Sequence, residues 1–150
     1  ASQSSVNIDE NELYCIGLLQ TIGVLALIHL SPQSMNDIFL NHIEHALASE
    51  EQNMFDGIDH FDVGAALLKH WGLPKQYHDV MLECRDEPLG SQCSITAAIV
   101  TRARELIDSD FTVENPVLDA KLGLVPAALM QVETDLQQDQ KWIESFSTNF

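Results

Sequence analysis

The chain has 150 residues, 45% of them apolar and 20% charged, which is typical of one globular domain with a hydrophobic core and excludes a disordered segment. Its 7 basic and 23 acidic residues give a formal net charge of −16, which disfavours binding to nucleic acid or to anionic membranes. An odd number of cysteines without a C-x-x-C pair favours reduced thiols in a cytoplasmic protein: Cys15, Cys84 and Cys93.

The N-terminal region shows no signal peptide, because its first twelve residues are polar and carry no basic segment. The most apolar run, residues 16–30, is shorter than the roughly 20 residues that a membrane span needs. It also contains Gln20, Thr21 and His29, so we expect a buried helix and no membrane contact. Because the chain begins with Ala rather than Met, we expect it to be a portion of a longer protein.

Helical periodicity recurs along the chain, and no segment alternates with the period of a β-strand. The first helix is predicted over about residues 9–30, apolar nearly all round, as is typical of a central core helix. Ser31 and Pro32 supply an N-cap and a first-turn proline for a second helix, and a polar loop is predicted over residues 49–59. The second helix carries one apolar stripe: Met35, Ile38, Phe39, His42, Ile43, Ala46 and Leu47.

A third helix is predicted from Asp59 or His60 to Trp71, after which Gly72 fits the left-handed position and Pro74 starts the next helix. The packed face of the third helix is predicted to be His60, Gly64, Leu67 and Trp71, and that of the fourth Tyr77, Val80, Met81 and Cys84.

A fifth helix is predicted over about residues 92–107, followed by a short helical piece that ends at Gly123 and a last helix that Pro126 opens. The fifth helix is expected to turn five residues inward: Thr96, Val100, Ala103, Leu106 and Ile107. The last helix carries an apolar stripe of Leu129, Val132, Leu136 and Ile143. Because no repeat or linker interrupts the pattern, residues 1–150 are predicted to form a single all-α domain.

Several short segments resemble, in order, the HDOD family, the HD-related output domains of bacterial signalling proteins. Residues 17–23 resemble its G-L-L-H-[DN]-I-G segment, and residues 57–65 resemble its G-x-D-H-x-x-V-G-A segment. Residues 71–74 match W-x-L-P, residues 84–85 fall where many members carry H-H, and residues 122–124 resemble the family's C-terminal end. The resemblance implies an HD-domain-like multi-helical bundle in bacterial signal transduction. The family's N-terminal helical half is not recognised, so the chain is expected to be the C-terminal portion of the module.

The resemblance also points to the metal site of HD phosphohydrolases, in which His and Asp side chains from several helices bind one or two divalent metals. Such ligands must be neutral imidazole or ionised carboxylate, and the bound metal lowers the pKa of a water molecule so that it attacks at neutral pH. Here the matching positions hold one histidine, and the others hold poor metal ligands or cationic side chains. The resemblance therefore implies a degenerate site without metal, cofactor or catalytic residue. These positions are Gln20, Thr21, His60, Cys84, Arg85 and Arg104.

Some of these residues allow a second interpretation. Arg85 and Arg104 either place positive charge that suits a phosphate or nucleotide or, as we favour, pair with acidic neighbours. His60 and Cys84 are each expected to be packed core residues more often than ligands. The His42 and His45 pair, three residues apart, is interpreted as packing rather than metal binding, and the His78-Asp79 dipeptide as a chance match.

The preferred hypothesis is a non-catalytic regulatory module that acts through contacts with other domains of the same polypeptide, with a signalling partner, or with further copies of itself. The terminal helix, with Trp142 and Phe146 four residues apart, either docks on a partner or, as we favour, completes its own core. The alternative is a divergent metal-dependent phosphohydrolase that cleaves a nucleotide or cyclic dinucleotide. A third hypothesis is a nucleotide sensor that uses Arg85 and Arg104.

Overall fold

The computed structural model describes residues 9–41, 47–85, 89, 92–109 and 112–147 of the chain, and within these ranges all regular structure is helical. The helices are α1 (Glu10–Leu19), α2 (Ile22–Leu30), α3 (Pro32–Asn41), α4 (Leu47–Met54), α5 (His60–His70), α6 (Lys75–Glu83), α7 (Ile95–Asp108), α8 (Pro116–Leu122) and α9 (Pro126–Ser147). The prediction of an all-α bundle is confirmed. The predictions for His42 and His45, and those for the side chains of Trp142, Ile143 and Phe146, fall outside what the structure describes.

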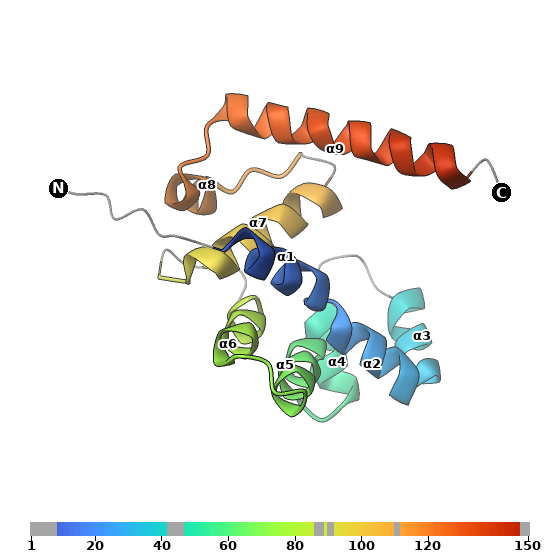
Figure 1. Cartoon of the computed structure of the whole chain (residues 1–150). Helices are drawn as coiled ribbons and strands as arrows, with labels where there is room; N and C mark the ends of the chain where they lie inside the picture. The colour runs from blue at the N-terminus through green and yellow to red at the C-terminus, as the bar shows by residue number, and fades with distance from the viewer. Residues whose placement is uncertain (1–8, 42–46, 86–88, 90–91, 110–111, 148–150) are drawn as a thin grey trace.

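The helices form a compact body with one long helix lying across it. In Figure 1, α2 to α6 make up the lower part of the body, α1 and α7 cross above them, and α9 runs along the top. Helix α5 is central to the lower part, because it packs against α2 on one side and α6 on the other. Helix α7 contacts α6, a helix of the lower part, and also α1 and α8, so it connects the lower part to the helices above it.

Two groups of buried apolar side chains hold this arrangement together. The larger lies between α1, α5, α6, α7 and α8, and it includes the fully buried Leu68 and Leu118. The smaller lies between α2 and α3 and contains Leu27, Met35 and Ile38. The predicted inward positions Met35 and Ile38 on α3, and Val80, Met81 and Cys84 on α6, are confirmed as buried.

Helices α2 and α5 meet backbone to backbone at Gly23. A Cβ atom added at Gly23 would lie 1.8 Å from the carbonyl oxygen of His60 and 2.9 Å from the backbone nitrogen of Gly64. Only a residue without a side chain permits two backbones to come this close. Gly23 therefore sets the position of α5, whose first residue is His60, against α2.

The helix ends follow the local chemistry of the sequence. Asp59 begins α5 with a capping box, in which its side chain accepts a bond from the Asp62 backbone and the Asp62 side chain accepts one from the Asp59 backbone. Gly72 has the left-handed φ of +74° that was predicted for it after α5. Gly123, predicted as the end of a short helical piece, follows α8 with a φ of +66°. Helix α6 begins directly after Pro74, also as predicted.

The predicted first helix is wrong in two respects. It is divided at Gln20 and Thr21 into α1 and α2, and only one of its sides is buried. Tyr14, Leu18 and Leu25 are 68%, 61% and 58% exposed, because α5, α3 and α7 pack against one side of the segment alone.

The expectation that this region is too short to span a membrane is also wrong. The 21 residues of Glu10–Leu30 are long and apolar enough to cross a membrane, judged by length and composition. Core helices of soluble proteins and N-terminal signal sequences have the same length and composition, so this property assigns no location to the chain.

The predicted polar loop over residues 49–59 is also wrong in its first half, which forms α4. The segment Leu47–Met54 reads LASEEQNM, and most of its residue types are strong helix formers, which outweighs its low apolar content. The true loop is short and turns through Asp56 and Gly57, whose φ angles are 55° and 88°. One carboxylate of α4, Glu51, is fully buried.

Five residues predicted to be packed are exposed, including Val132 on the apolar stripe of α9, which is 42% exposed. Trp71 is 52% exposed because α5 ends at His70, so the packed face of this helix is continued by Phe61, Ala65 and Leu68 instead. Phe39 on α3 is 50% exposed, and Ala103 and Ile107 on α7 are exposed where α9 stands away from α7.

Candidate functional site

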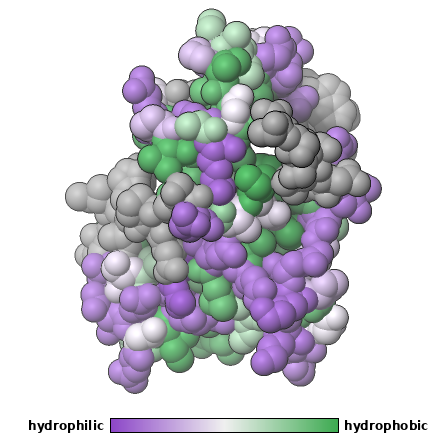
Figure 2. Space-filling model, turned by 90° about the vertical axis from the view of Figure 1, so that its left-hand side faces the viewer, coloured by the Kyte–Doolittle hydropathy of each residue, from purple (hydrophilic) through white to green (hydrophobic). Residues whose placement is uncertain are grey.

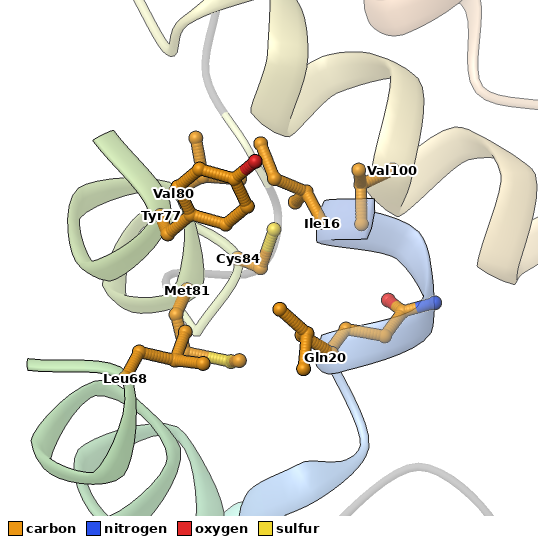
Figure 3. Close-up of a pocket in the computed structure, with 9 residues that line it drawn as sticks. Ile16, Gln20, Leu68, Tyr77, Val80, Met81, Cys84 and Val100 are labelled. Carbon is orange, nitrogen blue, oxygen red and sulfur yellow. The ribbon is translucent and has the colours of Figure 1, made fainter. Parts of the chain in front are cut away.

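The predicted site residues come from the ends of α1 and α6, the start of α5 and the middle of α7. Gln20, at the end of α1, and Cys84, at the end of α6, line the same small cavity (Figure 3). The volume of this cavity is about 10 Å³, which is at the limit of what one water molecule requires. Its other walls are almost entirely apolar: Ile16, Leu19, Leu68, Tyr77, Val80, Met81 and Val100.

Gln20 and Thr21 stand at the break between α1 and α2, where Gln20 is half-buried and Thr21 is exposed. The Gln20 amide extends away from Cys84 in Figure 3, and its buried oxygen has no hydrogen-bond partner among the described residues. Thr21 occupies the N-cap of α2 without a side-chain capping bond, and it is exposed. Neither side chain therefore contributes to a polar cluster with Cys84.

Cys84 is a buried thiol with an exposed fraction of 2%. Burial raises the pKa of this thiol above its ordinary value, and the positive charge of Arg104 opposes the shift to a smaller extent. The group is therefore a protonated, packed thiol at neutral pH, whereas metal binding requires a thiolate.

His60 is held by a buried carboxylate that the sequence did not reveal. The Oε2 atom of Glu51 lies 2.6 Å from Nδ1 of His60 and accepts a second bond, of 2.8 Å, from the His60 backbone N–H. The second carboxylate oxygen of Glu51 is buried without a hydrogen-bond partner in the described structure. The His60 ring also packs against the Phe61 ring, with centroids 4.0 Å apart.

Arg85 lies beside the two aspartates of the α5 capping box. Its Nη1 atom is 2.7 Å from Oδ1 of Asp62 and 3.7 Å from Oδ2 of Asp59. Asp59 is fully buried and also accepts a bond of 2.6 Å from Gln52, a residue of α4. The interpretation that Arg85 pairs with acidic neighbours agrees with this geometry, which ties the end of α6 to the start of α5.

Arg104 makes a different contact, with an aromatic ring. Its guanidinium carbon lies 5.9 Å from the centroid of the Phe61 ring, within the range of a cation–π interaction. Phe61 therefore lies against both His60 and Arg104.

The His78-Asp79 dipeptide lies on α6, and its contacts are local. His78 Nε2 is 3.0 Å from the Leu73 carbonyl oxygen, and Asp79 pairs with Lys75 at 2.7 Å. Across the part of the chain that the structure describes, no three His, Cys, Asp or Glu side chains are grouped so that they could hold a metal ion.

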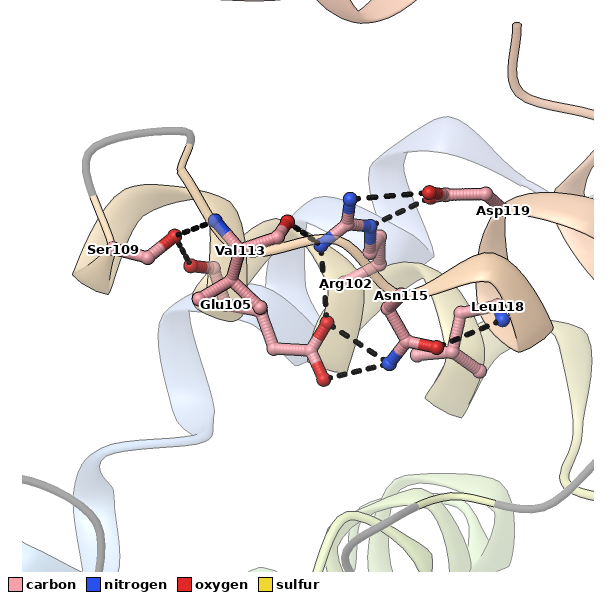
Figure 4. A network of polar contacts seen from close by, with 7 residues as sticks. All are labelled: Arg102, Glu105, Ser109, Val113, Asn115, Leu118 and Asp119. Carbon is pink, nitrogen blue, oxygen red and sulfur yellow. Dashed lines mark hydrogen bonds and ion pairs between the residues drawn. The ribbon is translucent and has the colours of Figure 1, made fainter.

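A second polar network, which the sequence also did not reveal, joins α7 to α8 (Figure 4). The buried Arg102 bonds to both carboxylate oxygens of Asp119, at 2.7 and 3.2 Å, and to Oε2 of Glu105 at 3.2 Å. Its Nη1 also donates to the Val113 carbonyl oxygen, and Asn115 donates to Glu105 while it caps α8. These bonds satisfy the buried guanidinium and fix the loop before α8, a structural role.

Comparison with known proteins gives one match. The family model of the HDOD domain matches residues 2–86, which is more than half of the chain. The matched range includes the segments around Gly23, His60, Trp71 and Cys84, whereas residues 122–124 lie beyond it. Neither the curated proteins nor the solved structures contain a match.

Proposed function

The chain belongs to the HDOD domain family, and we propose that it is a non-catalytic regulatory module of bacterial signal transduction whose HD metal site is degenerate. The observation that carries this proposal is the chemistry at the six positions where the family resemblance places metal ligands. The proposal assigns the module to the cytoplasm and assigns it no cofactor.

These six residues do not fit a divalent metal ion. The amide of Gln20 and the exposed hydroxyl of Thr21 supply no negative charge, and Cys84 is buried as a neutral thiol. Arg85 and Arg104 add positive charge, which opposes a bound cation. His60 remains as the one ordinary ligand type among the six, and a single histidine does not form a metal site. The cavity that Gln20 and Cys84 line has room for about one water molecule.

The polar contacts around His60 and Arg85 support a mechanical role. Glu51, Asp59 and Arg85 join α4, the start of α5 and the end of α6 by buried or half-buried polar contacts. A unit built in this way transmits a displacement of one helix to the others, because polar groups withdrawn from water are costly to separate. We assign the output to contacts between such helices and other domains of the same polypeptide or a signalling protein.

Metal content and phosphodiesterase activity of the purified chain test this proposal. We expect less than about 0.1 equivalent of iron, manganese or zinc by mass spectrometry, and no hydrolysis of cyclic dinucleotides or of a nitrophenyl phosphodiester with added Mn²⁺, because one histidine does not form a site. His60→Gln is the test variant. His78→Gln is its matched control, because His78 lies on α6 and bonds only to the Leu73 carbonyl in the described structure.

The alternative, a divergent phosphohydrolase, predicts the opposite pattern. Stoichiometric metal, with activity that a chelator and His60→Gln remove and His78→Gln leaves intact, would refute the non-catalytic assignment. A thermal shift with a nucleotide that is lost in Arg85→Gln would instead support a nucleotide sensor. We expect no shift, because Arg85 already pairs with Asp62.

A further inference from the structure

A large apolar cavity lies between α7, α8 and α9, apart from the small cavity beside Cys84. Its volume is about 590 Å³, within the range of pockets that hold small organic molecules. Most of its lining on α7 and α9 is apolar and includes Ile99, Ala103, Ile107, Leu129, Val132 and Leu136. Figure 2 faces the end of the molecule where α8 and the start of α9 lie, and hydrophobic side chains (green) are exposed in the upper part of this face. The cavity is therefore suited to a hydrocarbon chain.

The charged residues in the lining of this cavity are cations. Arg102 and Lys121 line it, whereas no Asp or Glu among the described residues does. This reverses the balance of the whole chain, which has 23 acidic and 7 basic residues. Because carboxylates are the more abundant charged groups and are absent from this lining, the cavity favours a ligand that carries an anionic group.

The two cations have different surroundings. Arg102 is buried and bonds to Asp119, Glu105 and the Val113 carbonyl oxygen, so its charge is compensated within the protein. Lys121 is half-buried near the end of α8, in the wall of the cavity. An ammonium group has three N–H donors on a flexible stem, so it can bind a ligand carboxylate and still keep a contact in the protein. Lys121 is therefore the residue at which the anionic group of a ligand is expected.

The volume of the cavity limits the length of the hydrocarbon chain. An enclosed cavity of about 150 Å³ holds one benzene molecule, so at the same density 590 Å³ has room for about 24 non-hydrogen atoms. The cavity is open to solvent, so a ligand fills only part of this volume. A fatty acid of about 12 to 16 carbons, with roughly 14 to 18 non-hydrogen atoms, fits within it.

The net charge of −16 does not prevent an anion from binding at this place. At physiological salt, charges more than about 8 Å apart are largely screened, whereas Lys121 acts at contact. A cationic amphipathic helix is the other occupant that suits an apolar cavity between helices, and it would bring its positive charges toward Arg102 and Lys121. The lining therefore favours a fatty acid over such a helix.

We propose that the cavity between α7, α8 and α9 binds a free long-chain fatty acid, with its hydrocarbon chain between α7 and α9 and its carboxylate at Lys121. The proposal goes beyond the regulatory function above. Its outcome is independent of the metal question, because none of the six positions of the degenerate site lines this cavity.

Isothermal titration of the full chain with dodecanoate tests the site. We expect saturable binding with a Kd below about 1 mM, and no binding of acetate, which has the carboxylate without the hydrocarbon chain. Ala103→Trp is expected to raise the Kd at least about 10-fold, because an indole at this exposed lining position occupies part of the cavity. Ala127→Trp is the matched control, since Ala127 is exposed on α9 and lies outside the lining.

Lys121→Gln tests the position of the carboxylate. It is expected to raise the Kd of dodecanoate at least about 5-fold, because a charge-assisted bond is lost. Lys75→Gln removes the same charge from an exposed lysine on α6 and is expected to change the Kd less than about 2-fold. Circular dichroism and thermal melting verify the fold of each variant.

Several results would overturn the proposal. One is the absence of saturable binding up to about 1 mM dodecanoate. Another is binding that Ala103→Trp or Lys121→Gln leaves unchanged, because the ligand would then lie elsewhere or be held without its carboxylate. Tighter binding of a Lys-rich amphipathic peptide, lost in Ala103→Trp, would replace the fatty acid by a helix of a partner protein. Binding to phosphatidylcholine vesicles but not to dodecanoate would replace it by a membrane surface.

Discussion

The close approach of α2 to α5 makes one substitution, Gly23→Ala, a direct test of the fold. The added methyl group would lie 1.8 Å from the His60 carbonyl oxygen and 2.7 Å from its carbonyl carbon, both backbone atoms that no side-chain rotation can move. The two helices must separate by more than about 1 Å to restore ordinary contact, and a gap of that size removes a quarter to a half of the dispersion attraction across it.

The size of the effect follows from two opposing contributions. Overpacking a core position costs ~1–3 kcal/mol or more, and the loss here is at the upper end because backbone must move. Alanine gains about 1 kcal/mol over glycine in a helix interior and less at Gly23, the second residue of α2, so this gain offsets only part of the cost. We expect Gly23→Ala to lower the free energy of unfolding by about 2–3 kcal/mol, and to lower Tm by roughly 4–12 °C for a chain of this length.

Gly17→Ala is the matched control, because Gly17 lies in the interior of α1 and an added Cβ would meet nothing within 4 Å. The same exchange is expected to raise the free energy of unfolding by up to about 1 kcal/mol there. Urea denaturation of both variants, with the slope checked for a change in the surface exposed on unfolding, measures the difference. If the two variants have equal stability, or if Gly23→Ala is the more stable, the contact between Gly23 and His60 does not exist as described.

Three further substitutions test other parts of the structure. Arg102→Lys is expected to cost about 2–4 kcal/mol in urea denaturation, because one ammonium group cannot make the paired bonds to Asp119 that the buried guanidinium makes. Glu51→Ala is expected to cost about 2–4 kcal/mol, because it leaves two buried N–H groups of His60 without an acceptor, whereas Glu51→Gln retains one acceptor and costs less. Burial raises the pKa of Cys84 above its ordinary value of 9.0, so the unfolded thiol ionises first as pH rises. The stabilising contribution of this thiol is therefore complete below pH 9. The free energy of unfolding decreases as pH rises from 9 to the pKa of the folded thiol, and Cys84→Ala removes this part of the decrease.

Each of these three experiments has a control. Lys75→Arg changes an exposed cation whose ion pair with Asp79 lies on α6, and it is expected to leave stability nearly unchanged. For Cys84, the exposed Cys15 is expected to react with iodoacetamide at once while Cys84 stays protected in the folded chain. Rapid alkylation of Cys84 under native conditions, or equal losses in Glu51→Ala and Glu51→Gln, would contradict the burial described here.

Local chemistry in the sequence was sufficient for much of the helical framework. Gly72 and Gly123 were recognised as helix-ending residues, and the spacing of Met35 and Ile38 correctly marked the inner side of α3. The order of short segments, two of which contain Gly23 and His60, was enough to identify the family. These features depend on residues within a few positions of one another, so a reading along the chain finds them.

Contacts between distant residues could not be found in this way. The bond between Glu51 and His60 joins α4 to α5, and that between Arg85 and Asp62 spans 23 residues, so neither leaves a periodic signal. A run of apolar residues such as 16–30 shows that a helix is hydrophobic, but not which side is covered. The packing of α5, α3 and α7 against one side buried Ile16 and Leu27 and left Leu18 and Leu25 exposed, because burial depends on which helices meet in space and not on the hydrophobicity of the segment itself.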